Sequence, residues 1–314
     1  FKLIIILEVI KLSPSNLPEV KKVELGAGFE MEIPLVYEKL KQQAEKEIEQ
    51  ILSKYPKAFK MWKLLNSDPE VHADWDIANF IAVGKLKYND HGEVHAKIVA
   101  QNALKMLEIL LECGILPDIM KMHAGDEDDV HLVVLAAALL HDIGNVTHRE
   151  DHHLHSVYMA IPILNRLLPQ IYEHPEVMFE IRNHILHCIY AHGEKVKDLT
   201  IEASLVGIAD GTDMTKGRGR LAFDTGNVNI HTVSALSIEE VSITKGEEKP
   251  IRILIKMSNS AGIFQVQETL VPKIIRSPLE DYVEIIAYTE PLGSTSDQRI
   301  VHRLIIKDGK LVPK

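Results

Sequence analysis

The feature that most constrains this chain is the apolar run VHLVVLAAALL at residues 130–140, which ends directly in His141 and Asp142. The run is about half as long as the roughly 20 residues that a membrane-spanning helix needs. A run of this length is typical of a helix buried in the core of a soluble domain. We therefore expect no transmembrane segment and a His-Asp pair at the end of a buried helix.

Composition limits the partners that the chain can have. Its 314 residues carry a formal net charge of −10, which disfavours broad contact with a phosphate backbone, so nucleic acid is an unlikely partner. The two cysteines, Cys113 and Cys188, are too few for a disulfide framework in a chain of this length. This usage indicates a reducing compartment, and we expect a cytoplasmic protein.

The sequence divides into three regions. Residues 1–34 have Pro and Gly between short apolar clusters such as FKLIIILEVIK, which predicts strands and loops. From residue 35 to 232, apolar residues recur at helical spacing on a charged background, which predicts a many-helix domain. Residues 233–314 switch to period two around one helix, which predicts a strand-strand-helix-strand-strand module. The expected fold class is mainly α, a helical bundle followed by a small C-terminal α+β module.

Several histidines and aspartates lie at or near the ends of the predicted helices, where a bundle would gather their side chains around an interior pocket. The candidates for metal ligation are His95, His141, Asp142, His148, His152, His192 and Asp210. If the segment is helical, His148 and His152 share a face, with His155 on the same flank. The sequence does not fix the register among these three.

The choice of the late histidine is also open. His184 and His187 compete with His192, which we prefer because Ile185 and Ile189 precede it at the spacing of a buried helix face. The remaining histidines singled out as packing or surface residues are His72, His123, His131, His174, His231 and His302.

Four stretches within about residues 88–222 follow one another in a recognisable order: HGEVHAKIV, LLHDIGNVTHREDHH, IYAHG and GIADGTDMTKGRGR. In this order of a single His, a His-Asp pair after an apolar helix, later histidines and a final Asp, the chain resembles the HD superfamily of metal-dependent phosphohydrolases. The resemblance implies a helical domain that holds one metal ion or a pair of them.

The resemblance also implies which residues bind each ion. The first ion would be held by His95, His141, Asp142 and Asp210. The second would be held by His152 and His192 with Asp142 bridging the pair, and His148 is the next candidate. Mixed histidine and carboxylate ligands suit Mn, Fe, Co, Ni or Zn, so we expect two divalent transition-metal ions per chain.

Two departures from the family argue against a cyclic-dinucleotide phosphodiesterase. Position 145 is Asn, whereas several phosphodiesterase branches carry Lys directly after the HDIG segment. The Gly-Tyr-Pro signature of such a branch is also missing after the late histidines.

Phosphate-ester hydrolysis needs a nucleophile formed from water and positive charge near the phosphoryl oxygens, and a metal pair supplies both. Asp142 and Asp210 are therefore the expected catalytic residues. The segment KGRGR offers Lys216, Arg218 and Arg220 to bind substrate phosphate, and a solvated basic loop is the alternative interpretation.

Three acidic or imidazole side chains are expected near the site without being assigned as ligands. Asp213 would orient a ligand histidine or be exposed, and Asp90 and His91 would border the pocket.

The leading hypothesis is a metal-dependent phosphohydrolase acting on a small-molecule phosphate ester, such as a nucleotide. One alternative is a di-iron oxygenase on the same fold, and another is a regulatory module whose metal site is not catalytic. In the C-terminal module, we expect a surface for homodimerisation or a lid, with ligand sensing as the lesser alternative.

Overall fold

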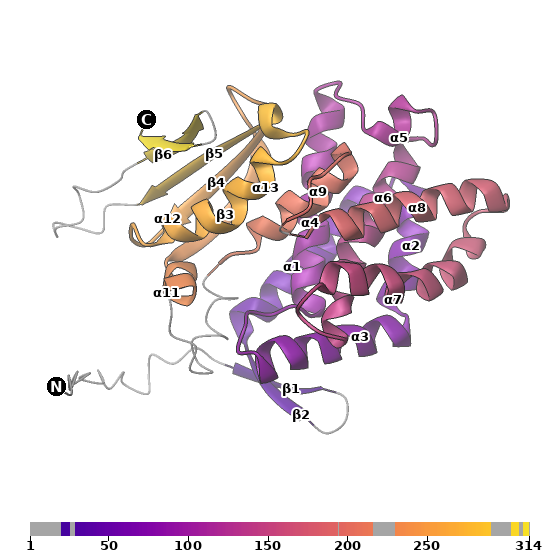
Figure 1. The fold of residues 1–314 in the computed structure, drawn as a ribbon, viewed down its shortest axis with the longest axis horizontal. Coiled ribbons are helices and arrows are strands. Elements are labelled where there is room, and N and C mark those ends of the chain that lie inside the picture. The colour runs from indigo at the N-terminus through magenta and orange to yellow at the C-terminus, as the bar shows by residue number, and fades with distance from the viewer. Residues whose placement is uncertain are drawn as a thin grey trace.

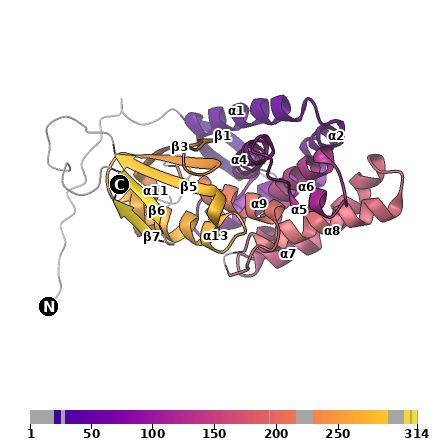
Figure 2. The same cartoon turned by 90° about the horizontal axis from the view of Figure 1, so that it is seen from above.

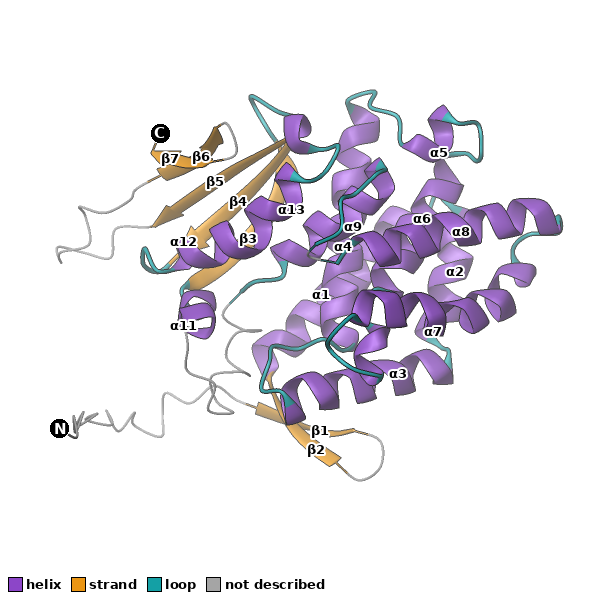
Figure 3. Cartoon of the chain, viewed as in Figure 1, coloured by secondary structure: helices purple, strands orange, loops and turns teal. Residues whose placement is uncertain are grey.

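The structure is a computed structural model that describes residues 20–25, 29–193, 195–215, 230–289, 303–307 and 310–313. Helices gather at one end of the molecule and a β-sheet at the other (Figure 1). Figure 3 shows a separate antiparallel hairpin of β1 (Val20–Leu25) and β2 (Phe29–Pro34) beside the helices. The predicted fold class is confirmed, while the predicted strand at residues 1–11 lies outside the described residues.

The helical part is built from short and medium-length helices. In chain order these are α1 (Leu35–Leu52), α2 (Pro56–Asn66), α3 (Pro69–Asn79), the π-helical η3 (Phe80–Lys85), α4 (Glu93–Glu112), α5 (Asp118–Lys121), α6 (Glu127–Leu140), η4 (Ile143–Val146), α7 (His152–Leu167), η5 (Leu168–Gln170), α8 (Pro175–Ala191) and α9 (Ile201–Thr212). The next described helix, α11 (Ile230–Leu236), lies at the sheet end of the molecule (Figure 1).

Helix α6 forms the centre of the bundle. It begins with a capping box in which the carboxylates of Asp126 and Asp129 each accept the other's main-chain N–H. Every residue from Asp128 to Leu140 is buried, and α2, α4, α8 and α9 pack around it. A window within Glu127–Val146 is long and apolar enough to cross a membrane, but 94% of it is buried inside the protein. The helix therefore serves as the core that the apolar run predicted.

The turn after α6 packs directly against α7. A Cβ atom at Gly144 would lie 2.1 Å from the carbonyl oxygen of His152 and 2.3 Å from the amide nitrogen of Ser156. The Gly144 N–H also donates to Ser156 Oγ at 2.8 Å. Only glycine fits this close backbone approach, which joins the turn carrying Asp142 to the first turn of α7.

The C-terminal sheet has the strand order β3-β4-β5-β6-β7. Its strands are β3 (Ile238–Lys245), β4 (Ile251–Met257), β5 (Val283–Thr289), β6 (Arg303–Lys307) and β7 (Lys310–Pro313). The central pair β4 and β5 is parallel, and the other described pairs are antiparallel. The sequence predicted two strands after the helix, and the described residues contain three, because β6 and β7 are separate strands that pair antiparallel.

A crossover segment joins the two parallel strands and faces the helical part. It consists of α12 (Gly262–Gln265), the π-helical η6 (Val266–Leu270) and α13 (Val271–Ile275), followed by the short η7 (Glu280–Tyr282). Helix α13 and η6 pack against α9, and the view from above shows α13 between the sheet and the bundle (Figure 2). The proposed division of the chain at residue 232 falls within α11 and stays a prediction.

Candidate metal centre

Five helices bring the candidate side chains to one place in the bundle. His95 comes from the first turn of α4, whose start is fixed because the carboxylate of Asp90 accepts the His95 N–H. His141 and Asp142 follow α6, whereas His152 opens α7. The remaining members are His192, which ends α8, and Asp210 in the last turn of α9.

A first group of donor atoms surrounds one point. His95 Nε2 lies 3.2 Å from His141 Nε2, 3.4 Å from Asp142 Oδ2 and 3.2 Å from Asp210 Oδ1. His141 Nε2 lies 3.4 Å from the same oxygen of Asp142 and 3.9 Å from that of Asp210. Histidine and carboxylate bind metals at about 2.0–2.2 Å, so donors around one cation lie about 3 Å apart. The group therefore has the spacing of a metal site.

A second group lies on the other side of Asp142. His152 Nε2 is 3.1 Å from His192 Nε2 and 3.3 Å from Asp142 Oδ1, and His192 Nε2 is 3.8 Å from that oxygen. The two oxygens of Asp142 thus face different histidine pairs. Each oxygen is available to a separate cation, which is the arrangement of a bridging carboxylate.

The other ring nitrogen of each histidine is already engaged. His95 Nδ1 is bonded to Asp213 Oδ2 at 2.7 Å, so Asp213 orients a ligand histidine rather than being exposed. Three main-chain carbonyls accept from the remaining Nδ1 atoms in the pairs His141–Ala138, His152–Arg149 and His192–Ile189. These bonds fix the tautomer in which Nε2 carries the lone pair that a metal ion would bind.

The electrostatics of the site favour ionised carboxylates. Burial alone would raise the pKa of the Asp142 carboxyl, but His141, His91 and His95 hold that pKa well below its usual range. Burial would also raise the pKa of Asp210, and Lys273 together with His95 holds it well below the usual range. A buried carboxylate and a partly buried one beside the same histidines require compensating positive charge.

The two histidines of the second group are held in the neutral form. Burial lowers the pKa of His152 to about 4, with Asp142 opposing the change. Burial and the neighbouring His141 and His152 lower the pKa of His192 well below its usual value. Metal ligation needs neutral imidazoles and ionised carboxylates, so these side chains have the required protonation states at neutral pH.

Comparison with known proteins agrees with this geometry. The HD domain model matches residues 94–215. A relative from Methanocaldococcus jannaschii, the "Uncharacterized protein MJ1020", is 47% identical over 226 residues, which is 72% of this chain and 87% of that protein. The chain belongs to the HD superfamily of metal-dependent phosphohydrolases. No solved structure matches it.

The two donor groups around Asp142, here called the HD centre, do not include His148. Its side chain is exposed, and its Nδ1 accepts the Glu150 N–H at 3.0 Å. Helix α7 begins only at His152, after Asp151 in the left-handed conformation with φ of 55°. The residues between His148 and His152 therefore form a turn, and their spacing of four does not put the two rings on one face.

The other competing histidines also lie apart from the cation positions. Within the part of the chain that the structure describes, the facing donor groups contain His91, His95, His141 and His192 but neither His184 nor His187. Both sit farther back in α8, one and two turns before its C-terminal end. The preference for His192 thus agrees with the geometry.

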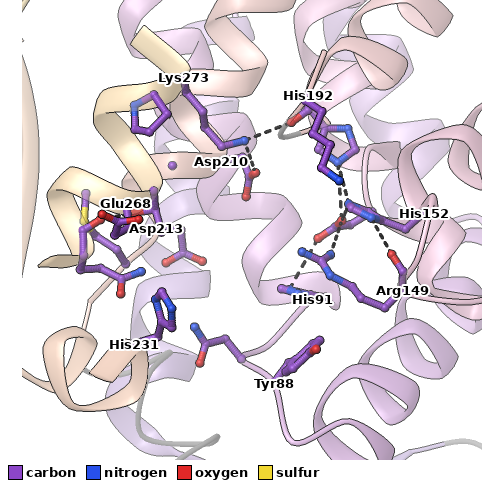
Figure 4. A pocket seen from close by; sticks show the side chains of 18 of the residues that line it. Tyr88, His91, Arg149, His152, His192, Asp210, Asp213, His231, Glu268 and Lys273 are labelled. Atoms are coloured by element: carbon purple, nitrogen blue, oxygen red, sulfur yellow. Dashed lines mark hydrogen bonds and ion pairs between the residues drawn. The ribbon is translucent and has the colours of Figure 1, made fainter. Parts of the chain in front are cut away.

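The HD centre opens into a cavity of about 650 Å³ (Figure 4). Its lining includes His91, as the sequence suggested, together with residues that the sequence did not single out for it. The latter include Tyr88, Asn89, Arg149, Lys195, Gln265, Glu268, Thr269, Lys273 and Arg276. His231, expected to be a packing or surface residue, also lines the cavity.

Two of these missed cations lie beside the aspartates. Arg149 Nη1 is 3.7 Å from Asp142 Oδ1, and Lys273 Nζ donates to Asp210 Oδ2 at 2.8 Å. Arg149 stands in the THRED segment between two candidate histidines, a position that could have suggested it. Lys273 is far from every motif, and no local signal points to it. The predicted phosphate-binding residues Lys216, Arg218 and Arg220 lie outside the described residues.

Asn145 has a role that the comparison with phosphodiesterases did not suggest. Its Nδ2 donates to Asp142 Oδ1 at 3.0 Å and to the Asp142 carbonyl at 2.8 Å. Asn145 therefore orients the bridging carboxylate of the HD pair from within the same turn.

Proposed function

We propose that this HD protein hydrolyses a phosphate ester with water activated between two divalent transition-metal ions. The proposal rests on the two carboxylate oxygens of Asp142, which face different histidines. Oδ2 faces His95 and His141, while Oδ1 faces His152 and His192. A purely structural metal site would need one closed set of ligands and no bridging carboxylate beside a cavity.

The metal pair and the protein have separate tasks in this reaction. Bound divalent cations lower the pKa of a water ligand to roughly 7 and offset the charge that develops on the phosphoryl oxygens. Asp142 and Asp210 supply the anionic ligands, and the fixed imidazoles supply neutral ones. Asn145 and Asp213 keep Asp142 and His95 in the orientations that ligation needs.

The chain's own cations would bind the phosphate of the substrate. Arg149 lies on the cavity side of Asp142, next to the second histidine pair, where its guanidinium can donate to phosphoryl oxygens. Lys195 and Arg276 add positive charge farther along the wall. A substrate with a phosphate at the metal end and an organic group in the remaining space fits this arrangement.

The size of the cavity supports a small-molecule substrate. Its volume of about 650 Å³ lies within the range of about 300–1,000 Å³ found for small-molecule sites. We therefore propose a nucleotide or a related phosphate ester as substrate. The ligand set supports Mn, Fe, Co, Ni or Zn as the ions, and free thiols at Cys113 and Cys188 support a reducing, cytoplasmic location.

The test combines metal analysis with a substrate screen. The untagged protein would be analysed by elemental mass spectrometry, stripped with chelator and reloaded with each ion. It would then be assayed on p-nitrophenyl phosphate, bis-p-nitrophenyl phosphate and a panel of nucleotides, with the chelated protein as control. We expect about two ions per chain and hydrolysis that depends on them.

Other outcomes would contradict the proposal. A coloured iron protein whose absorption changes with dioxygen would favour the di-iron oxygenase. Two firmly bound ions with no turnover of any ester, or no bound metal at all, would favour a regulatory binding module.

A further inference from the structure

One cation of the C-terminal module enters the metal centre of the helical domain. Lys273 stands on α13, within the crossover between β4 and β5, and its side chain is almost completely buried. Its Nζ donates to Asp210 Oδ2 at 2.8 Å and to the carbonyl oxygen of His192 at 3.1 Å (Figure 4). A single ammonium group thus links one residue from each of the two cation positions.

The fold makes room for this approach. A Cβ atom at Gly211, the residue after Asp210, would lie 3.1 Å from Lys273 Cδ and 3.3 Å from the carbonyl oxygen of Thr269. Glycine at this position therefore lets η6 and α13 pack closely against the end of α9. The neighbours of Lys273 on the crossover, Leu270 and Ile274, are buried apolar residues. A lysine between them is costly unless its charge is paired.

The two oxygens of the Asp210 carboxylate have different partners. Asp210 Oδ1 faces His95 Nε2 at 3.2 Å, whereas Oδ2 accepts from Lys273. The lysine therefore prevents the carboxylate from rotating and leaves one oxygen for the first cation. Such support from outside the ligand set typically changes metal affinity by about 10–100-fold.

We propose that Lys273 is a positioning residue that sets the metal affinity of the first cation position, so that the C-terminal module is part of the metal centre. This inference rests on the two-metal centre proposed above, but not on the identity of the substrate. It also gives the module a task besides dimerisation or ligand sensing.

The test measures Mn²⁺ binding to metal-free protein by isothermal titration calorimetry. The His152→Ala background removes a ligand of the second position, so the remaining ion reports on the first. In this background Lys273→Met should raise the dissociation constant for Mn²⁺ by about 10–100-fold. Lys273→Arg, which keeps a charged donor, should stay closer to the parent than the Met variant does. Lys249→Met, which removes a lysine of the same module outside the cavity lining, is the matched control and should match the parent.

Two further measurements separate positioning from other roles. Thermal unfolding of the metal-free variants detects a purely structural effect, and Lys273→Gln replaces the Met variant if that variant does not fold. In the otherwise unaltered chain, excess Mn²⁺ should restore the kcat of Lys273→Met on p-nitrophenyl phosphate with KM unchanged. A raised KM at saturating Mn²⁺ would instead indicate substrate contact.

The inference is overturned if Lys273→Met, or its Gln replacement, binds Mn²⁺ as tightly as the parent. It is also overturned if the parent chain binds no divalent metal. Because binding is measured without substrate, the reaction and this inference can fail separately. A chain that binds two ions, loses affinity with Lys273→Met and hydrolyses no ester would contradict only the proposed reaction.

Discussion

The two cation positions share Asp142 but differ in how far the protein encloses them. At the first position, His95 and His141 have no exposed surface, and of its assigned ligands the carboxylates Asp142 and Asp210 reach the cavity lining. At the second, His152 and His192 themselves line the cavity, and Arg149 lies beside them. If both positions bind a metal ion, we expect the histidine side of the first to be the more enclosed and the second to lie nearer a bound substrate.

The largest effect is expected at Asp142, the residue that both cation positions share. Asp142→Ala removes a ligand from both positions, so the protein should bind fewer than one ion per chain. Activity should fall by more than about a thousandfold, the upper end for losing one charge-stabilising group. Elemental analysis and steady-state kinetics measure both quantities, and circular dichroism checks the fold. Turnover close to that of the parent would contradict the metal mechanism.

A change confined to the open position should leave the enclosed one intact. His152→Ala is expected to reduce the metal content from about two ions to about one per chain, with activity lower by about a hundredfold. His184→Ala, on the neighbouring helix but outside the donor groups, is the control. If His152→Ala lost both ions, the two positions would not be independent, and the comparison above would be wrong.

A smaller effect is expected behind the enclosed position. Asp213→Ala removes the carboxylate that accepts from His95 Nδ1, so the ring loses its fixed orientation. Metal affinity should fall by about 10–100-fold, and excess Mn²⁺ should recover most of the activity. Asp281→Ala, at an exposed carboxylate of the C-terminal module, should behave as the parent does. Affinity equal to that of the parent would show that Asp213 does not support the ligand.

The smallest effect concerns stability rather than turnover at neutral pH. The folded pKa of His152 is about 4 against an ordinary value of 6.5, so between these values the unfolded chain binds more protons. The metal-free protein should therefore lose stability as pH falls from about 6.5 to about 4, by about 3 kcal/mol from this residue. Urea unfolding across this range measures the loss. His152→Gln should reduce the slope, and an unchanged slope would assign it to other groups.

Much of the helical domain could be predicted because its signals are local. The apolar run before His141, for example, depends only on neighbouring residues and predicted the buried helix α6. The candidate ligands were proposed because they lie at or near the ends of apolar helices, and the family order of the motifs narrowed the choice.

The positions of His148, Lys273 and β7 were harder to predict, each for a different reason. His148 lies apart from the donor groups because the helical spacing considered for it runs through a turn that contains a left-handed residue at Asp151. Lys273 could not be predicted, since it is 63 residues from Asp210 and meets it only after the crossover has packed on α9. The extra strand β7 was missed because a strand of four residues is too short to show a clear alternating pattern.

The close backbone approach at Gly144 bears on how far the metal sites of related proteins can differ from one another. The turn carrying Asp142 and the helix carrying His152 touch through their main chains, so we expect backbone packing to set the spacing of two cations bound there. Exchanging a ligand side chain is expected to change which metal ion is preferred but not where that ion binds. Relatives that keep this glycine are therefore expected to share one cation spacing even where their preferred ions differ.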